Sequence, residues 1–482
     1  MRNEASIPLP PCIETYRNRE AAFVYRSRTY NFSLSHGLFS SADVDAGSRF
    51  LLKIFSNFLD RQGPASSRFF GAGLFGRETP IKVLDAGSGT GVLGICAAGA
   101  ISDSAARQGA GDGELHLESA SGIPSVLCRA QDRDDLARLF TEHNARRNGL
   151  SEEIFSSHTE PLLAGPELWD LILTNIPAKA GAPVLEDFIR RSAGLLKKDG
   201  LVFLVAVAPL ADFFRTHIKA SAGLVYEEAG KGHTVFVYGR KPGVPEPAVC
   251  PIIFDENFPG SYPFYIRNQS EYEMEGISYR LDTLYGAPDF DSPGGVIQAA
   301  AKLSVKINLA EKLKPGSVLI HDEGQGHFGL WLAHYLKVAA PGTACASYNS
   351  GGSCASNRSV EYRQVLSGRN ILALGAAKAA LSHAGISSAI FPSVELYPEW
   401  KHLSANAGGF ALIAFFPEAV PECDRREADW KALPALAAPG GLVIAGMSSM
   451  EADRFDRKKP PAFSRLGDIR RKGFRAMAYV SS

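Results

Sequence analysis

The 482-residue chain has no long hydrophobic run, few cysteines and no excess of charge of either sign. Its longest apolar stretches, such as residues 201–208, have the length of a strand and are too short to span a membrane. The N-terminus carries Arg2 and Glu4 and lacks the apolar core of a signal peptide. We therefore expect a cytoplasmic protein that has no membrane partner.

The cysteine count argues against disulfide-linked and metal-binding proteins, and the charge balance gives no sign of a strongly basic or acidic protein. Seven cysteines, odd in number and without paired spacing, favour reduced thiols and argue against a metal site. Lys+Arg and Asp+Glu number 51 each, so the overall charge gives no argument for nucleic acid. With 45% hydrophobic and 21% charged residues the chain is an ordinary globular protein, and its length fits two or three domains.

One glycine-rich stretch stands out among these ordinary features. An apolar strand at 81–84 leads to Asp85, then to a turn and a helix from about 92 to 100. Glycine lets the backbone turn tightly and approach a ligand, and the helix N-terminus offers unpaired N–H groups. The pattern fits a nucleotide or S-adenosylmethionine. An acid before the glycines favours S-adenosylmethionine, whose amino acid end carries a cationic amine. The expected cofactor-binding residues of this turn are Asp85, Gly87, Ser88, Gly89 and Gly91.

A second acid ends the next predicted strand. Residues 126–132 form an apolar stretch that closes on Asp132, and a helix follows that ends at Asn148-Gly149. A carboxylate at this strand tip can accept both hydroxyls of a ribose. We therefore expect Asp132 to bind the cofactor. The alternative is that Asp85 and Asp132 only cap helices.

The third element is the strand at 169–175, which ends in Asn175-Ile176-Pro177. Pro177 stops the strand because it has no N–H to donate. The side-chain carbonyl of Asn175 and the main-chain carbonyl of Ile176 can both accept from one exocyclic amine. Such a pair catalyses by orienting the nitrogen lone pair toward a methyl donor. We expect these three residues to be catalytic, although an Asn-x-Pro turn alone is common.

In this order the elements resemble the small methyltransferase domain family, and most closely the ribosomal RNA small-subunit guanine-N2 methyltransferases. The resemblance runs from about residue 25 to residue 241. It includes an upstream segment, His36-Gly37-Leu38-Phe39-Ser40 followed by residues 44–52, and a last strand at 232–238. In the family the upstream segment helps to form the pocket for cofactor and substrate. The resemblance implies an S-adenosylmethionine-dependent enzyme with RNA as its partner.

One departure from the family concerns the substrate. The family continues the third motif with Phe or Tyr, whose ring stacks on the flipped-out base, whereas this chain has Ala178 followed by Lys179. Such stacking is worth roughly 1–3 kcal/mol. Phe39 is our candidate for the missing ring. We therefore name Phe39, Ala178 and Lys179 as substrate-binding residues, and the acceptor is less certain than the methyl transfer.

The domain organisation follows from composition and from an internal repeat. We expect a tail over 1–20, a catalytic domain over 21–242, a proline-rich linker over 243–263 and a degenerate methyltransferase-like domain over 264–482. Gly, Ser and Ala dominate residues 102–123, which we interpret as a surface insertion. The predicted fold class is α/β, with two tandem Rossmann-like folds that are each a doubly wound, mostly parallel sheet.

The second copy repeats the pattern of the first without its chemistry. At an offset of 235, Ile320 replaces Asp85 and Asp322 replaces Gly87, and no asparagine precedes Pro417. We expect this copy to support the fold or to hold the substrate. His321 and His327 lack the pattern of a metal site, and we interpret them as polar groups of a loop.

The C-terminal region carries one electrostatic signal. Residues 454–475 hold nine Lys and Arg residues against Asp456 and Asp468. This excess fits either phosphate binding or a solvated helix and hairpin.

These observations predict methyl transfer to an exocyclic amine, with guanine N2 of ribosomal RNA as the first candidate. Two alternatives stay open. One is a methyltransferase that acts on a protein glutamine or a small-molecule amine. The other is a non-catalytic module that senses the cofactor or binds the ribosome.

Overall fold

The computed structural model describes residues 11–60, 79–109, 125–165, 167–241, 243, 258–289, 291–339, 362–404 and 408–482. Contacts divide the chain into two units, one of residues 1–252 with 420–422 and one of residues 253–419 with 423–482. Most of the expected linker and residues 110–123 of the expected insertion lie outside the described residues. Within those residues no helix is long and apolar enough to cross a bilayer.

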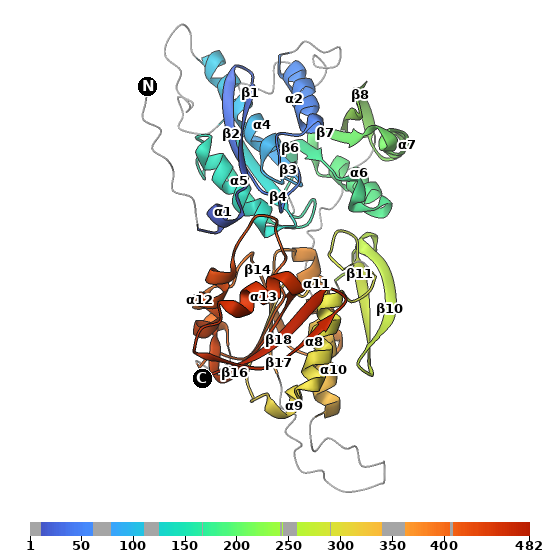
Figure 1. Cartoon of the computed structure of the whole chain (residues 1–482). Coiled ribbons are helices and arrows are strands. Elements are labelled where there is room, and N and C mark those ends of the chain that lie inside the picture. Colours follow the sequence, from blue (N-terminus) through green and yellow to red (C-terminus); the bar gives the residue numbers. More distant parts are fainter. Residues whose placement is uncertain are drawn as a thin grey trace, which may run out of the picture. The chain divides into compact units, whose positions relative to one another are not determined.

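The N-terminal unit contains a seven-stranded sheet in the order β5-β4-β3-β6-β7-β9-β8, with a separate β1–β2 hairpin (Figure 1). The sheet is parallel except at β9, which runs antiparallel to both β7 and β8. The strands of the unit, hairpin included, are β1 Arg19–Tyr25, β2 Arg28–Leu34, β3 Ile81–Ala86, β4 Val126–Asp132, β5 Phe155–Thr159, β6 Trp169–Asn175, β7 Leu196–Val207, β8 Gly223–Ala229 and β9 His233–Gly239. Its helices are α1 Pro11–Tyr16, α2 Ala46–Leu59, α4 Val92–Gly109, α5 Asp135–Arg147, η1 Ala178–Ala180, α6 Ala182–Gly194, η2 Ala208–Leu210 and α7 Ala211–Ser221.

Apolar runs explain the central strands of this sheet. β3, β6 and the second half of β7 are buried on both faces, which is typical of parallel strands covered by helices. The apolar sides of α2 and α4 share one core with the hairpin and these strands. The strands expected at 126–132 and 169–175 are confirmed at those bounds.

The helix after the glycine turn is longer than expected. We predicted an end near residue 100, but α4 continues to Gly109. Ser102 is buried within the helix, so the first part of the expected surface insertion is wrong. Alanine-rich sequence favours a helix, and this preference outweighed the polar composition that suggested a loop.

The C-terminal unit repeats the architecture, with a seven-stranded sheet in the order β14-β13-β12-β15-β16-β18-β17 (Figure 1). The predicted α/β class with two tandem Rossmann-like folds is therefore confirmed. Its strands are β10 Ile266–Met274, β11 Ile277–Leu284, β12 Val318–His321, β13 Gln364–Gly368, β14 Ser388–Pro392, β15 Phe410–Phe415, β16 Ala437–Ser448, β17 Phe463–Arg471 and β18 Phe474–Ser481. Its helices are η3 Pro263–Tyr265, α8 Gly295–Lys306, α9 Leu309–Lys312, α10 His327–Ala339, α11 Ile371–His383, η4 Pro398–Leu403, α12 Arg426–Leu436 and α13 Ser449–Arg457.

Asn144 of α5 and Asn148, the C-cap of that helix, attach the hairpin to the rest of the N-terminal unit. The Asn148 side chain accepts from the Asn31 N–H and donates to the Asn31 carbonyl, both at 2.9 Å. The Asn144 side chain accepts from the Ser33 N–H at 2.8 Å and donates to the Ser33 carbonyl at 3.1 Å. It also donates to the Thr90 carbonyl at 2.9 Å. Since Thr90 belongs to the glycine turn, Asn144 connects the hairpin, α5 and that turn.

We predict that Asn144→Ala lowers the free energy of unfolding of the N-terminal unit by about 2–4 kcal/mol, because three buried backbone groups lose their partner. Urea unfolding combined with hydrogen exchange measures this effect unit by unit. Arg146→Ala on the same helix is the control, since its exposed ion pairs contribute about 0–1 kcal/mol. Equal stability of the two variants would contradict the connecting role of Asn144.

Candidate functional site

Three strand ends bring the predicted polar residues to one edge of the N-terminal sheet. β3 lies between β4 and β6, and Asp85 pairs in register with Ala130 on one side and Leu173 on the other. Asp132 and Asn175 stand two residues beyond these partners. Because the three strands are parallel, all three side chains lie at the carboxyl edge of the sheet, where ligands bind in this class of fold.

The Asp85 side chain is buried, with 1% of the residue exposed. Its Oδ2 accepts from the Gly94 N–H of α4 at 2.8 Å, whereas its Oδ1 is buried and has no hydrogen-bond partner among the described residues. Burial raises the pKa of this carboxyl to about 7 against the lowering effect of the Gly94 N–H, and the charge of Asp132 adds to the rise. An unpaired buried oxygen is costly unless a ligand satisfies it.

The turn after Asp85 depends on glycine. Gly87, Gly89 and Gly91 have φ values of 80°, 56° and 85°, in the left-handed region that favours glycine. At Gly94 an added Cβ would lie 2.9 Å from the Asp85 carboxylate, so only glycine lets α4 approach the strand so closely. Ser88 is buried in the turn and its N–H donates to the Gln131 carbonyl at 3.0 Å.

Asp132 braces this turn from the neighbouring strand. Its Oδ2 accepts from the Gly89 N–H and its Oδ1 from the Asp134 N–H, both at 3.0 Å. Burial raises the pKa of the Asp132 carboxyl. The helix-capping role that we weighed for Asp132 is not seen, because Asp134 is the N-cap of α5. Each carboxylate oxygen can still accept a second hydrogen bond, as a ribose requires.

Asn175 is held by two residues of the upstream segment, 44–52, for which the sequence predicted no individual role. Its Nδ2 donates to Asp45 Oδ1 at 3.0 Å and to Ser48 Oγ at 3.1 Å. Asp45 is the N-cap of α2, and Ser48 lies in the first turn of that helix. The amide nitrogen is therefore engaged, and the carbonyl oxygen of Asn175 is the group that can accept from a ligand.

The remaining predicted residues surround this strand end. Ile176 is buried, Pro177 caps η1, and Ala178 and Lys179 are exposed on η1. Phe39 lies in the loop between β2 and α2 with 65% of its surface exposed. The end of this loop is joined to Asn175 through Asp45.

The residues of this edge fit S-adenosylmethionine. The unpaired Oδ1 of Asp85 suits the cationic amine of its methionine part, and the glycine turn leaves the backbone accessible. Asp132 would hold the ribose.

The C-terminal unit keeps two glycines of the turn, Gly324 and Gly326, but it differs at the positions of Asp85, Gly87, Asp132 and Asn175. The sheet registers align Ile320 with Asp85 and Phe416 with Asn175. The Asp322 N–H donates to the Ser367 carbonyl, just as the Gly87 N–H donates to the Gln131 carbonyl in the N-terminal unit. Asp322 has a φ of 56°, which is unfavourable for a residue other than glycine. Gly368 stands in the place of Asp132, and a Cβ there would lie 2.8 Å from the Asp322 carboxylate. The replacement of Gly87 by Asp322 is confirmed.

One feature of the first site survives in this unit. Glu323 Oε2 accepts from the Gly329 N–H of α10 at 2.6 Å, as Asp85 does from Gly94. Burial raises the pKa of the Glu323 carboxyl to about 7. Glu323 thus anchors α10 in this unit, although Asp85, Asp132 and Asn175 have no counterparts there that could bind a ligand.

We expected His321 and His327 to be polar groups of a loop, and this expectation is wrong. β12 extends to His321 and α10 begins at His327, so both side chains are buried. His321 Nδ1 lies 3.1 Å from Ser367 Oγ, and His327 Nδ1 lies 3.0 Å from Tyr279 Oη. Among the described residues no group of His, Cys, Asp and Glu could hold a metal ion.

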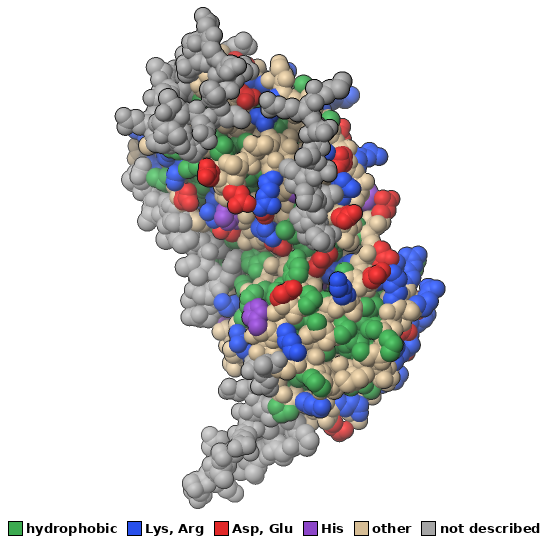
Figure 2. All heavy atoms as spheres, turned by 90° about the vertical axis from the view of Figure 1, so that its left-hand side faces the viewer, with side chains coloured by type: hydrophobic (Ala, Val, Ile, Leu, Met, Phe, Trp, Pro, Cys, Tyr) green, Lys and Arg blue, Asp and Glu red, His purple; other side chains and the backbone are tan. Residues whose placement is uncertain are grey.

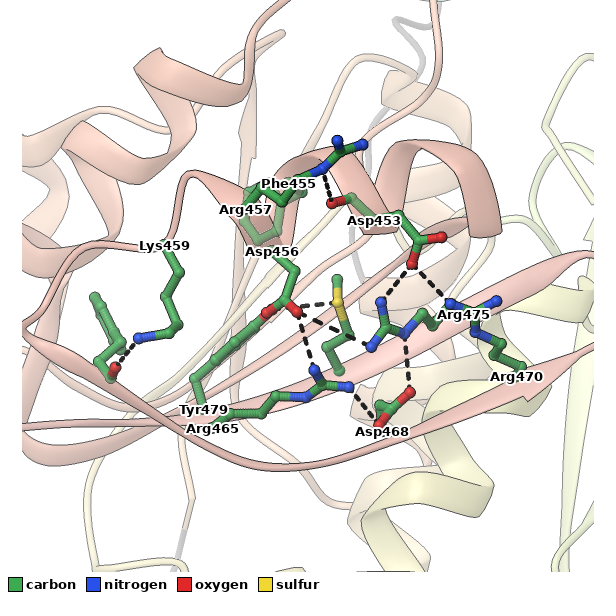
Figure 3. A network of polar contacts seen from close by, with 12 residues as sticks. Asp453, Phe455, Asp456, Arg457, Lys459, Arg465, Asp468, Arg470, Arg475 and Tyr479 are labelled. Carbon is green, nitrogen blue, oxygen red and sulfur yellow. Dashed lines mark hydrogen bonds and ion pairs between the residues drawn. The ribbon is translucent and has the colours of Figure 1, made fainter.

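The basic C-terminal residues lie on α13 and on the β17–β18 hairpin. Figure 2 shows Lys and Arg side chains gathered along one edge of the C-terminal unit. Figure 3 shows that acids of the same region partner several of them. Asp453 Oδ1 lies 2.8 Å from Arg470 and 2.6 Å from Arg475, and Asp468 pairs with both Arg465 and Arg475. These pairs reduce the charge that a phosphate backbone would meet.

Comparisons with known proteins define the class. The family model of the methyltransferase small domain matches residues 100–227, which run from α4 into β8 and include Asp132 and Asn175. Over these residues the N-terminal unit is similar to the methyltransferase small domain, and together with the fold this match indicates an S-adenosylmethionine-dependent methyltransferase.

Two individual proteins are similar to this chain. The uncharacterized protein YbxB of Bacillus subtilis (strain 168) is 24% identical over 185 residues, which are 38% of this chain and 72% of that protein. The T. Thermophilus 16S rRNA N2 G1207 methyltransferase RsmC, solved with AdoMet and guanosine, is 13% identical at a TM-score of 0.53. That alignment covers 98% of this chain and 100% of the other, and it shows a common fold.

We predict that affinity for S-adenosylmethionine falls as the pH is lowered below about 7, by up to about tenfold per unit. The reason is that Asp85, with its pKa near 7, must lose its proton to face the cationic amine. Calorimetric titrations between pH 5.5 and 7.5 measure this slope. Asp85→Asn should bind more weakly and show a flatter profile. An unchanged slope in that variant would contradict the role of Asp85.

Proposed function

We propose that the chain transfers a methyl group from S-adenosylmethionine to the exocyclic N2 amine of a guanine in ribosomal RNA, and so acts in the cytoplasm. The observation that carries this proposal is the orientation of Asn175. With its nitrogen bound to Asp45 and Ser48, its carbonyl oxygen is left to accept from an amine at the carboxyl edge of the sheet. The similar T. Thermophilus enzyme is a 16S rRNA N2 G1207 methyltransferase, which supports guanine N2.

In this mechanism the chain acts by positioning. The bound cofactor supplies a methyl group on a sulfonium, which is already a good leaving group. Asn175 Oδ1 and the Ile176 carbonyl accept from the two N–H groups of the acceptor amine and so direct its lone pair at the methyl carbon. Transfer would join the methyl carbon to the acceptor nitrogen and break the carbon–sulfur bond, which would leave the neutral thioether S-adenosylhomocysteine. The proton that the nitrogen loses would pass to water. Alignment of this kind can lower a barrier by several kcal/mol.

The substrate contacts are the less defined part of the site. Phe39, with its exposed ring, is the candidate to stack on the guanine, since Ala178 has no ring to offer. Lys179, next to Ala178 in the sequence, is exposed and can bind a phosphate. The absence of a ring at Ala178 also favours a second candidate, a protein glutamine or a small-molecule amine, because either presents an N–H₂ group to the same two acceptors.

We predict that Asn175→Ala lowers methyl transfer at least about 100-fold, because the amine is no longer oriented, while the Kd for the cofactor changes less than about threefold. Transfer of labelled methyl groups to ribosomal RNA from a strain that lacks the chain measures the first quantity, and calorimetry measures the second. Arg146→Ala is the surface control.

Three outcomes would count against parts of this proposal. Label in protein or in a small molecule in place of RNA would support the second substrate. Full activity of Asn175→Ala would remove its catalytic role. Failure of the wild-type chain to bind the cofactor would favour the non-catalytic module.

A further inference from the structure

The carboxylate of Asp45 takes part in two structures at once. Its Oδ1 accepts from the N–H groups of Gly47 and Ser48, at 2.8 and 3.1 Å, and so caps α2. The same oxygen accepts from Asn175 Nδ2 at 3.0 Å, across 130 residues of sequence. Ser48 Oγ gives that nitrogen a second contact at 3.1 Å. A helix cap and the proposed catalytic amide therefore share one acceptor.

The contacts of Asn175 Nδ2 determine whether the amide presents its oxygen or its nitrogen to a ligand. An amide side chain has a donor end and an acceptor end of nearly the same shape, so a half-turn would replace one by the other. With the nitrogen outward, Asn175 would present N–H groups to an amine that also carries N–H groups. Hydrogen bonds to a carboxylate are about twice as strong as neutral ones, so Asp45 opposes this turn strongly.

The position of Asp45 is itself fixed by packing. Leu51, Leu52 and Phe55 of α2 are buried in the core shared with β7 and β9. A Cβ on Gly47 would lie 3.0 Å from Asp45 Oδ1 and 3.0 Å from the His233 ring. The carboxylate thus sits on a rigid helix start with no space for a larger residue at position 47.

The C-terminal unit acts as an internal control. α8 packs on β16 and β18 as α2 packs on β7 and β9, so the two helices correspond. The N-cap of α8 is Gly294, which makes no side-chain capping hydrogen bond, and Phe416 stands where Asn175 would be. The helix forms without an acidic cap. An acidic N-cap is therefore not required for a helix at this place, and Asp291 of the preceding segment contacts Thr283 and Arg267 instead.

We propose that Asp45 and Ser48 are positioning residues that hold the Asn175 amide with its carbonyl oxygen toward the acceptor amine. This inference rests on the proposed function of Asn175. It also gives the upstream segment, residues 44–52, a defined part in the reaction, since it supplies both acceptors.

The test compares variants that keep the helix cap. In Asp45→Ser the hydroxyl can still cap α2 but is shorter, and Ser48→Ala removes the second acceptor. We expect the double variant to lose about 100-fold in kcat, with KM for RNA and Kd for the cofactor changed less than about threefold. Asp45→Asn keeps an oxygen that can accept all three N–H groups and should retain kcat within about tenfold. A double variant with wild-type kcat would overturn the proposal, as would an Asp45→Asn enzyme as poor as the double variant.

A second comparison separates positioning from general damage. If Asp45 acts only through Asn175, then adding Asp45→Ser to Asn175→Ala should not lower the residual rate further. A further loss of tenfold or more would show that Asp45 acts by another route and would overturn the proposal.

The structure of the double variant gives a readout that does not depend on the substrate. We expect the Asn175 amide to be rotated or disordered in a crystal structure of this variant, even if the wild-type chain proves to methylate something other than RNA. An amide that keeps its orientation would overturn the positioning role alone. Absence of any methyl transfer by the wild-type chain would instead refute the proposed function.

Discussion

The N-terminal site depends on one buried carboxylate with two different oxygens. Asp85 Oδ2 anchors the first turn of α4 through the Gly94 N–H, and Oδ1 has no protein partner among the described residues. The anchor brings helix and strand so close that glycine is needed at position 94. The unpaired oxygen leaves a cost that a cationic ligand can remove. The turn between strand and helix is thus built around a group that the protein alone does not satisfy.

The two units show which residues the fold needs and which the chemistry needs. Both form seven-stranded sheets of the same order, and both retain an acid that anchors the helix after the first strand. The C-terminal unit nevertheless has apolar residues in place of Asp85 and Asn175, and a glycine in place of Asp132. The fold tolerates these changes, so it does not itself require the polar residues of the N-terminal unit. The ligand binding that we propose for them gives a reason for their presence.

The sequence predicted what is local and failed where distant residues meet. Apolar runs bounded by glycine and proline placed β3, β4 and β6, and the glycine turn was evident from its composition. The length of α4 was underestimated, because the polar residues at its end resemble a loop. The contact between Asp45 and Asn175 joins residues 130 apart, and no spacing rule indicates it. The ion pairs of Asp453 with Arg470 and Arg475 were likewise invisible until the hairpin placed them together.

A crystal structure of the chain with S-adenosylhomocysteine tests the central claim most directly. We expect one ligand per chain, at the carboxyl edge of the N-terminal sheet, with its amine at Asp85 Oδ1 and its ribose at Asp132. The Asn175 amide should keep its nitrogen on Asp45. A ligand bound in the C-terminal unit, or one whose amine lies away from Asp85, would contradict the claim that this unpaired carboxylate oxygen defines the site.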